Sequence, residues 1–440
     1  MITQTQGAGG KTDVIHLALA PARDNTVCAL AALTHGGHQA RVFCNAATQS
    51  DQIKTSPTFS PQKVTPLRGN AGVFVDGTHS GKQSDALTLA YGATHLTLPL
   101  SAPQNDHIAG LDCILTTLNQ ALSVPANPQD KAEDPLADPG YIAGWLHHHA
   151  KYQGVSGAVF INRLGPEDAG ADFAKLLRKA LDKTPVPLTR IVVLDVPGPT
   201  GWPDGIDERH LLCAPDAPGK SRMTRPEPDP WRAGFGDEIL LEFVRHALFA
   251  HANGVAYLDL SDWLAPAKAD SVFVQARAAK PDPLITLSGL RAFPWKLPNS
   301  GKARPGDHIC RPFDLKASFS RWVFSPAQAH DTAHIWRPHR IIGLTAQSAP
   351  DQHLWRFTGL RHPGAAPAQL VPKSSLRENA DLLALSRDTF GHKPFRVPAP
   401  DITKTPKAAK RGDKIVLVTA MKNEGPFLLE WIAYHRAIGV

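Results

Sequence analysis

The sequence predicts an α/β fold, with a mixed sheet flanked by helices and a small N-terminal α/β layer. Short apolar runs rich in β-branched residues recur along the chain, such as Val14 to Leu19 and Ile415 to Val418. Segments with the period of an amphipathic helix lie between them, as from Glu238 to Ala252. Proline and glycine clusters separate the two kinds of segment, which is typical of strands that alternate with helices in one sheet.

Residues 13–123 are predicted to form the N-terminal layer. In this region, strand patterns alternate with helix-like stretches. We expect strands at 14–19, 41–44, 73–75 and 96–100, and helices at 26–34, 84–91 and 107–122.

Proline-rich segments divide the rest of the chain. Residues 124–140 are a proline- and acid-rich loop, and residues 392–413 hold four prolines and mostly cationic charges, which suits an extended linker. A strand at 189–196 leads into a long proline- and glycine-rich excursion that ends near Gly236. Loops of that length inside a domain are usually functional or disordered. We therefore expect one domain at 124–391, a linker at 392–413 and a further unit at 414–440.

The last segment has the pattern of a strand, a polar turn and an amphipathic helix. Pro426 occupies a first-turn position that tolerates proline, and Glu424 favours the positive end of the helix. A single strand-helix unit cannot bury both faces of its strand, so it needs partners from elsewhere. We expect this chain to stop within the opening of a second domain.

This segment, from Lys414 to Val440, resembles the first strand-helix unit of bacterial family 2-like glycosyltransferases. The resemblance rests on residues in a fixed order, namely Met421-Lys-Asn-Glu424, Glu430-Trp431, Tyr434-His435 and Gly439-Val440. It implies a nucleotide-diphospho-sugar transferase-like fold, in which Asn423 and Glu424 help to shape the nucleotide-sugar site beyond the strand. The alternative is that both residues only cap a helix.

Residues 124–391 contain weaker matches to motifs of the same family. Trp145 and His149 repeat the spacing of Trp431 and His435. The strand pattern that ends in Asp259-Leu-Ser-Asp262-Trp-Leu resembles the family's Asp-x-Asp-Glu-Phe motif, with serine in place of the second aspartate. We interpret the chain as two copies of a glycosyltransferase-like domain. The first copy has diverged, and only the start of the second copy, which matches the family motifs more closely, is present.

The opening turn of the first copy has two competing candidates. Gln104-Asn-Asp106 follows the strand pattern at 96–100 and is a faint match to Lys-Asn-Glu. This assignment competes with the helix pattern around Trp145 for the same helix. The sequence leaves this choice open.

The resemblance also implies a metal site. In metal-dependent members the paired aspartates hold Mg²⁺ or Mn²⁺ against the diphosphate of the donor. Here Asp259 and Asp262 could share an ion, with His334 or His339 completing its shell. Ser261 offers only a neutral hydroxyl, which lowers the expected metal affinity. The alternative is that both aspartates merely end a strand and open a turn.

Three adjacent histidines, 147 to 149, suggest a metal tract at first sight. Neighbouring positions of a helix point in different directions, so they cannot form a one-sided ligand set. We expect a helix surface with one inward ring, that of His149.

Composition indicates a folded protein without a nucleic-acid partner. The 440 residues are 42% hydrophobic and include nine tryptophans, enough for substantial cores. The net charge of +7 is densest in the linker and forms no stripe with interleaved aromatics. We expect no membrane span and no signal peptide, and five scattered cysteines that remain reduced in a cytoplasm.

Two functions therefore remain open. The first is an enzyme that transfers a sugar from a nucleotide-sugar donor to a glycan, lipid or protein hydroxyl, mainly through the second copy. No residue of the chain is marked as its catalytic base. The second is a non-catalytic, glycosyltransferase-like module that binds the acceptor or braces a catalytic domain. The sequence does not indicate the donor sugar or the oligomeric state.

Overall fold

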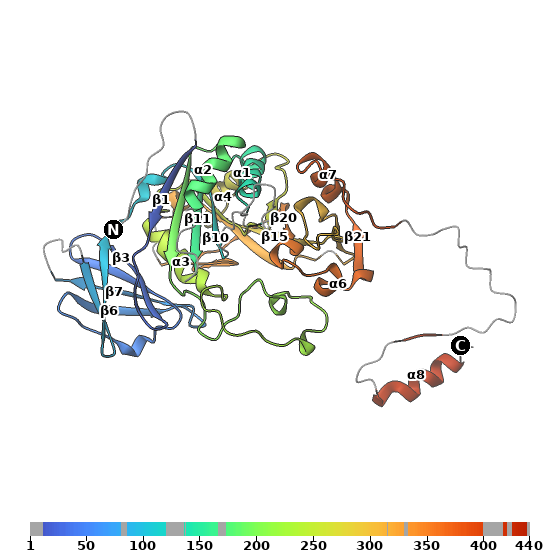
Figure 1. Cartoon of the computed structure of the whole chain (residues 1–440), viewed down its shortest axis with the longest axis horizontal. Coiled ribbons are helices and arrows are strands. Elements are labelled where there is room, and N and C mark those ends of the chain that lie inside the picture. The colour runs from blue at the N-terminus through green and yellow to red at the C-terminus, as the bar shows by residue number, and fades with distance from the viewer. Residues whose placement is uncertain are drawn as a thin grey trace. The chain divides into compact units, whose positions relative to one another are not determined.

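The computed structural model describes residues 12–80, 86–119, 136, 138–165, 173–314, 316–329, 333–398, 417–419 and 425–437. The chain forms two compact units, Met1–Arg396 and Val397–Val440. In the described part of the first unit, helices flank a large mixed sheet, and a second sheet is formed by the chain between the first strand of the large sheet and its remaining strands (Figure 1). The predicted mixed α/β class is confirmed. No described helix is both long enough and apolar enough to cross a bilayer.

The large sheet has the strand order β1-β12-β11-β10-β13-β17-β15-β20-β14. Its first five strands pair in parallel: β1 (Asp13–Ala18), β12 (Arg190–Pro197), β11 (Gly157–Leu164), β10 (Asp112–Leu118) and β13 (Gly254–Tyr257). The other half is mixed, because two of its strands run antiparallel to their neighbours. It consists of β17 (Phe319–Phe324), β15 (Leu284–Ala292), β20 (Gln347–Phe357) and β14 (Asp262–Leu264).

The strand order reverses between β10 and β13. From β10 the chain passes through α1 (Pro139–Gln153) to β11, and then through α2 (Phe173–Lys183) to β12. It returns through α3 (Gly236–Ala247) to β13, on the other side of β10. In open α/β sheets, ligands bind beyond the carboxyl ends of the strands at such a reversal. The residues after Leu118 and Tyr257 are therefore the first place to look for a site.

Both faces of the large sheet are covered, and adjacent strand residues alternate between them. Ile114 belongs to a core shared with α1, α2 and α4 (Val272–Ala278). Leu115, the next residue, belongs to a core shared with α3 and with the N-terminal sheet. Because both of their faces are buried, these strands consist of nearly continuous runs of apolar residues.

The N-terminal sheet shows where the sequence prediction was wrong. The stretches expected as helices at 26–34, 84–91 and 107–122 contain β3 (Val27–Thr34), β8 (Ala86–Tyr91) and β10. Six consecutive residues of β3 are buried, and a strand buried on both faces cannot be told from a buried helix by periodicity. β10 belongs to the large sheet, whereas β3 and β8 belong to the N-terminal sheet. The other strands of the N-terminal sheet are β2 (Ala22–Asp24), β4 (Gln39–Cys44), β5 (Ile53–Lys54), β6 (Phe59–Pro66), β7 (Val73–His79) and β9 (Thr94–Ser101).

Shorter elements complete the first unit. Two strand pairs lie outside both sheets, β16 (Cys310–Pro312) with β21 (Leu376–Glu378), and β18 (Ile335–Arg337) with β19 (Arg340–Ile342). The last helices are α5 (Thr358–Arg361), α6 (Pro367–Leu370) and α7 (Ala380–Asp388). All five cysteines are free, as expected.

The second unit contains α8 (Gly425–Ala437). Within α8, the His435 ring packs 4.1 Å from the Trp431 ring, and its Nδ1–H donates to the Trp431 carbonyl at 2.8 Å. In α1, His149 and Trp145 have the same arrangement, with a ring separation of 4.6 Å and a hydrogen bond of 2.8 Å. The repeated spacing seen in the sequence thus corresponds to a repeated local geometry.

Candidate functional site

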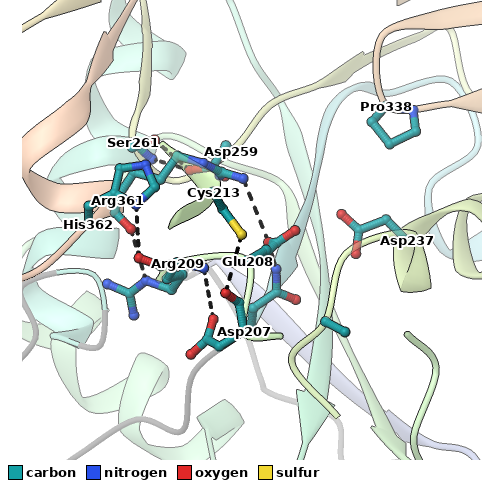
Figure 2. Close-up of polar contacts among 12 residues, drawn as sticks. Asp207, Glu208, Arg209, Cys213, Asp237, Asp259, Ser261, Pro338, Arg361 and His362 are labelled. Carbon is teal, nitrogen blue, oxygen red and sulfur yellow. Dashed lines mark hydrogen bonds and ion pairs between the residues drawn. The ribbon is translucent and has the colours of Figure 1, made fainter. Parts of the chain in front are cut away.

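The candidate site lies where the strand order reverses. Asn119 directly follows β10, and Asp259 lies two residues after the end of β13. Between them is a cavity of about 20 Å³, which Glu208, Arg209 and Arg361 also line. Figure 2 shows Glu208, Asp259 and Arg361 converging from separate parts of the chain.

The residues of the turn after β13 form hydrogen bonds with one another. One carboxylate oxygen of Asp259 accepts hydrogen bonds from the Ser261 amide at 2.8 Å and from the Ser261 hydroxyl at 2.6 Å. The Asp259 amide in turn donates to the Asp262 carboxylate at 3.1 Å. The serine that replaces an expected aspartate therefore fixes the rotamer of Asp259.

Arginines occupy the remaining oxygens of both aspartates. Arg361, at the end of α5, forms an ion pair with the second oxygen of Asp259. Asp262 is completely buried and accepts from Arg321 Nε at 2.9 Å and from Arg356 Nε and Nη2 at 2.7 Å each. Burial alone would raise the pKa of each aspartate, but these guanidinium charges hold both pKa values below the usual range. Both aspartates are therefore ionised and neutralised by the protein itself.

Glu208 closes the cavity from the long segment between β12 and α3. It accepts a hydrogen bond from the Asn119 amide, and it lies 3.8 Å from Arg361 Nη2. Burial raises the pKa of Glu208, while Arg361 opposes that rise. The sequence analysis did not single out Glu208 or Arg361, although it marked the excursion that carries Glu208.

A second layer of polar contacts supports Asn119. Arg163, on β11, donates to the Asn119 side-chain oxygen at 2.9 Å and lies 3.5 Å from Asp237. Asp237 accepts from the Tyr257 hydroxyl at 2.7 Å. Burial and the Asp237 charge raise the pKa of Tyr257 well above its usual value. Gly236 permits this packing, since a Cβ there would lie 2.7 Å from Arg163 Nη2.

The structure does not bring the predicted metal ligands together. Asp259 and Asp262 share one turn, but His334 precedes β18 and packs its ring 5.2 Å from Phe324. His339 donates from Nδ1 to the Ser320 carbonyl at 3.3 Å. Within the described ranges, no three His, Cys, Asp or Glu side chains gather in a way that could hold a metal ion. Mg²⁺ or Mn²⁺ prefers several free oxygen ligands, and the two carboxylates already bind guanidinium groups, so they do not fit such an ion.

Residues 104–106, one of the two candidates for an opening turn, follow a strand of the N-terminal sheet. This strand, β9, pairs with β8 and β3 in the N-terminal sheet. The strand that precedes α1 in the chain is β10, and Asn119 directly follows it. In the sequence, Asn119-Gln120 parallels Asn423-Glu424, a match hidden by the helical interpretation of 107–122. Asn423 and Glu424 lie outside the described residues.

The paired residues of α1 hold the segment that follows the aspartate turn. Trp145 Nε1 donates to the Asp262 carbonyl at 2.8 Å, and His149 Nε2 accepts from the Leu264 amide at 3.2 Å. The expectation that His149 points inward is confirmed. The expectation of a single inward ring is wrong, because His148 is buried as well and its Nε2–H donates to the Leu264 carbonyl at 2.8 Å.

Comparison with known proteins leaves the family open. No family model matches the chain, and no curated protein does so either. Among solved structures, the chain is similar to the mannosyltransferase Ktr4p from S. cerevisiae in complex with GDP. That match has 15% identity, spans 46% of each chain and has a TM-score of 0.23. A likeness that low defines no common fold.

The geometry limits what the site can do as it stands. Ligand pockets usually enclose roughly 300–1,000 Å³, and a cavity of roughly 10–15 Å³ already holds one water. The switch-point cavity, at about 20 Å³, is therefore large enough for a water molecule but too small for a ligand. A nucleotide sugar would fit only if Arg361 or Glu208 moved aside.

Proposed function

We propose that the protein serves the transfer of a sugar from a nucleotide-sugar donor to a glycan or lipid acceptor, with residues 1–396 as a non-catalytic, glycosyltransferase-like module. Support comes from the aspartate turn at the switch point and from the Trp-His pair that α1 shares with α8. In this role the module binds the acceptor or braces the catalytic domain.

The ion pair between Arg361 and Asp259 carries this proposal. In a metal-dependent transferase, a divalent cation on such an aspartate would offset the charge of the departing diphosphate. Here a guanidinium already takes that place, and Asp262 is bound to Arg321 and Arg356. The negative charge of the turn is thus neutralised by arginines of the same unit and is not available to a cation. This favours a binding or bracing role.

Catalysis would then fall to the second copy, for which we propose residues 414–440 as the opening unit. Asn423 and Glu424 would shape its nucleotide-sugar site, as the resemblance implies. The first copy would correspond to residues 124–391 together with β10, and residues 392–413 would link the copies. The catalytic base of the second copy is not assigned.

A second candidate is a metal-independent donor site in the first copy. Arg209 and Arg361 line the same cavity, and two guanidinium groups are good partners for a diphosphate. Glu208 lies beside them with a raised pKa, as a general acid would. This candidate requires the cavity to open.

Calorimetric titration of the 440-residue chain with UDP-glucose and GDP-mannose, with and without Mn²⁺, separates these possibilities. We expect the parent chain to show no Mn²⁺-dependent binding that requires Asp259, so the Asp259→Ala variant should give the same result as the parent. The exposed Asp314→Ala serves as the matched control, since Asp314 forms a surface ion pair with Lys316 and lines neither the switch-point cavity nor the aspartate turn. Mn²⁺-dependent binding that disappears in Asp259→Ala would overturn the non-catalytic role. Metal-independent binding that disappears in Arg361→Ala would establish the second candidate.

A further inference from the structure

A larger cavity lies between the N-terminal sheet and the segment that joins β12 to α3. Its volume is about 460 Å³, within the range of small-molecule sites. It shares no lining residue with the switch-point cavity. Loops of the N-terminal sheet contribute Gln49, Asp51 and Asn70, and the joining segment contributes Trp202 and Asp204. We call this cavity the Trp202 groove.

Trp202 forms an exposed aromatic platform with Phe235. The two rings stack with centroids 5.1 Å apart and planes 25° apart, and the residues are 39% and 51% exposed. Large aromatic residues are usually buried, so an exposed stacked pair beside a cavity suggests a binding surface. The indole Nε1 of Trp202 donates to the Gly69 carbonyl at 3.1 Å, which ties its ring to the N-terminal sheet.

The backbone under this platform is tightly fixed. A Cβ at Gly201 would lie 2.5 Å from the Ala233 carbonyl oxygen, and one at Gly205 would lie 2.6 Å from the Ala233 Cβ. Phe235 has a φ of 68°, a conformation that bulky residues rarely adopt. Such backbone strain persists only where the surroundings enforce it, and it clusters at functional sites. The aromatic pair is therefore held in a defined position.

The opposite wall offers polar groups without partners inside the protein. Within the described chain, no hydrogen bond occupies the side chains of Gln49, Asp51 or Asn70, and all three residues are exposed. Each amide presents a donor and an acceptor, and each carboxylate presents only acceptors. None of the residues lining the groove is a lysine or an arginine, whereas Asp51 and Asp204 add negative charge. The groove is thus unsuited to phosphates or acidic sugars.

We propose that the Trp202 groove binds a neutral glycan, with one pyranose ring stacked on Trp202. A pyranose has an apolar face of C–H groups that packs on an aromatic ring, and a rim of hydroxyls that need both donors and acceptors. Gln49 and Asn70 supply both, while Asp51 and Asp204 accept from sugar hydroxyls. The groove size suits a few sugar units.

The identity of the bound glycan as an acceptor rests on the proposed function. The segment that carries Trp202 also carries Glu208 into the switch-point site, so both features belong to one piece of chain. Binding of the glycan itself does not depend on any transfer reaction.

The test is a titration of the 440-residue chain with maltohexaose, cellohexaose and mannohexaose, followed by calorimetry and tryptophan fluorescence. We expect at least one of them to bind, a loss of tenfold or more in affinity for Trp202→Ala, and a smaller loss for Asn70→Ala. Phe313→Ala, which removes a 67% exposed aromatic residue that does not line the groove, should leave affinity unchanged. A heparin hexasaccharide should bind more weakly than the neutral sugars.

Three results would overturn the inference: no binding of any neutral hexasaccharide at millimolar concentration, equal affinity of Trp202→Ala and the parent, or tighter binding of the heparin hexasaccharide. Unchanged melting temperatures verify that the variants are folded. Because the assay contains no nucleotide sugar, its failure would leave the proposed transfer role standing. Conversely, Mn²⁺-dependent donor binding at Asp259 would refute the non-catalytic role without affecting the groove.

Discussion

Charge compensation explains the aspartate turn at the level of single residues. A buried carboxylate is stable only if it is paired and hydrogen-bonded. Asp262 meets this condition through three hydrogen bonds from Arg321 and Arg356. Asp259 meets it through Arg361 and Ser261. The substitution of serine for a carboxylate therefore agrees with arginines, instead of a metal, as the counter-charges.

Asp262→Asn should be strongly destabilising, because it leaves two buried guanidinium groups without their carboxylate. Breaking a buried ion pair on one side costs about 3–5 kcal/mol. Urea unfolding at pH 7 measures the loss. The matched variant Asp314→Asn, at an exposed pair with Lys316, should change the unfolding free energy by less than about 1 kcal/mol. Similar small losses for both variants would show that Asp262 does not organise the turn.

At the scale of elements, helix α1 positions the aspartate turn through its indole and imidazole groups. Trp145→Phe keeps an aromatic six-membered ring but removes the pyrrole part of the buried indole, and with it the donor to the Asp262 carbonyl, which stays buried. An unsatisfied buried acceptor costs about 1–3 kcal/mol. We expect a loss of that size in chemical unfolding. The control variant is Trp231→Phe, at a half-buried tryptophan away from the aspartate turn. An equal loss of stability in the two variants would argue against a role of Trp145 in holding the turn.

The same helix should make stability depend on pH. Burial lowers the pKa of His148 to about 4, so the folded state holds this ring neutral. The unfolded chain binds a proton near pH 6.5, so the contribution of His148 is complete above that pH and is lost as pH falls from 6.5 towards 4. Over this window the loss from His148 is about 3 kcal/mol, at about 1.4 kcal/mol per unit.

Replacing His148 by glutamine removes the titration and keeps a donor for the Leu264 carbonyl. The unfolding free energy of His148→Gln should therefore fall less steeply than that of the parent between pH 6.5 and 4. Other buried histidines, such as His308 and His362, keep a residual slope in both proteins. Parallel curves for the two proteins would contradict a buried neutral His148.

Local sequence patterns could predict apolar runs rich in β-branched residues and helices with a clear amphipathic period. The strands at 14–19 and 189–196 and the helix starting near Glu238 were expected and are present. The strand β3 was mistaken for a helix, because burial on both faces removes its alternation. Arg361 and Glu208 could not be predicted as site residues, since they reach Asp259 and Asn119 only through the tertiary fold.

At the scale of the molecule, the two sheets of the first unit share one core. Phe43 of the N-terminal sheet packs edge-on against Phe243 of α3, with ring centroids 5.4 Å apart. Arg41 pairs with Asp76 and also contacts His246 at the end of α3. The strands before and after the N-terminal sheet, β1 and β10, both belong to the large sheet. The N-terminal layer is thus integral to the first unit.

This arrangement predicts how the chain responds to truncation. Removal of residues 1–123 deletes β10, which pairs with both β11 and β13 and supplies buried residues to both cores. We therefore expect residues 124–440 to be insoluble or to lack a cooperative thermal transition in circular dichroism. Residues 1–396 form a compact unit by themselves and should retain a cooperative transition. Cooperative unfolding of 124–440 would mean that the large sheet can form without its central strand, and that the boundary at residue 123 separates independent domains.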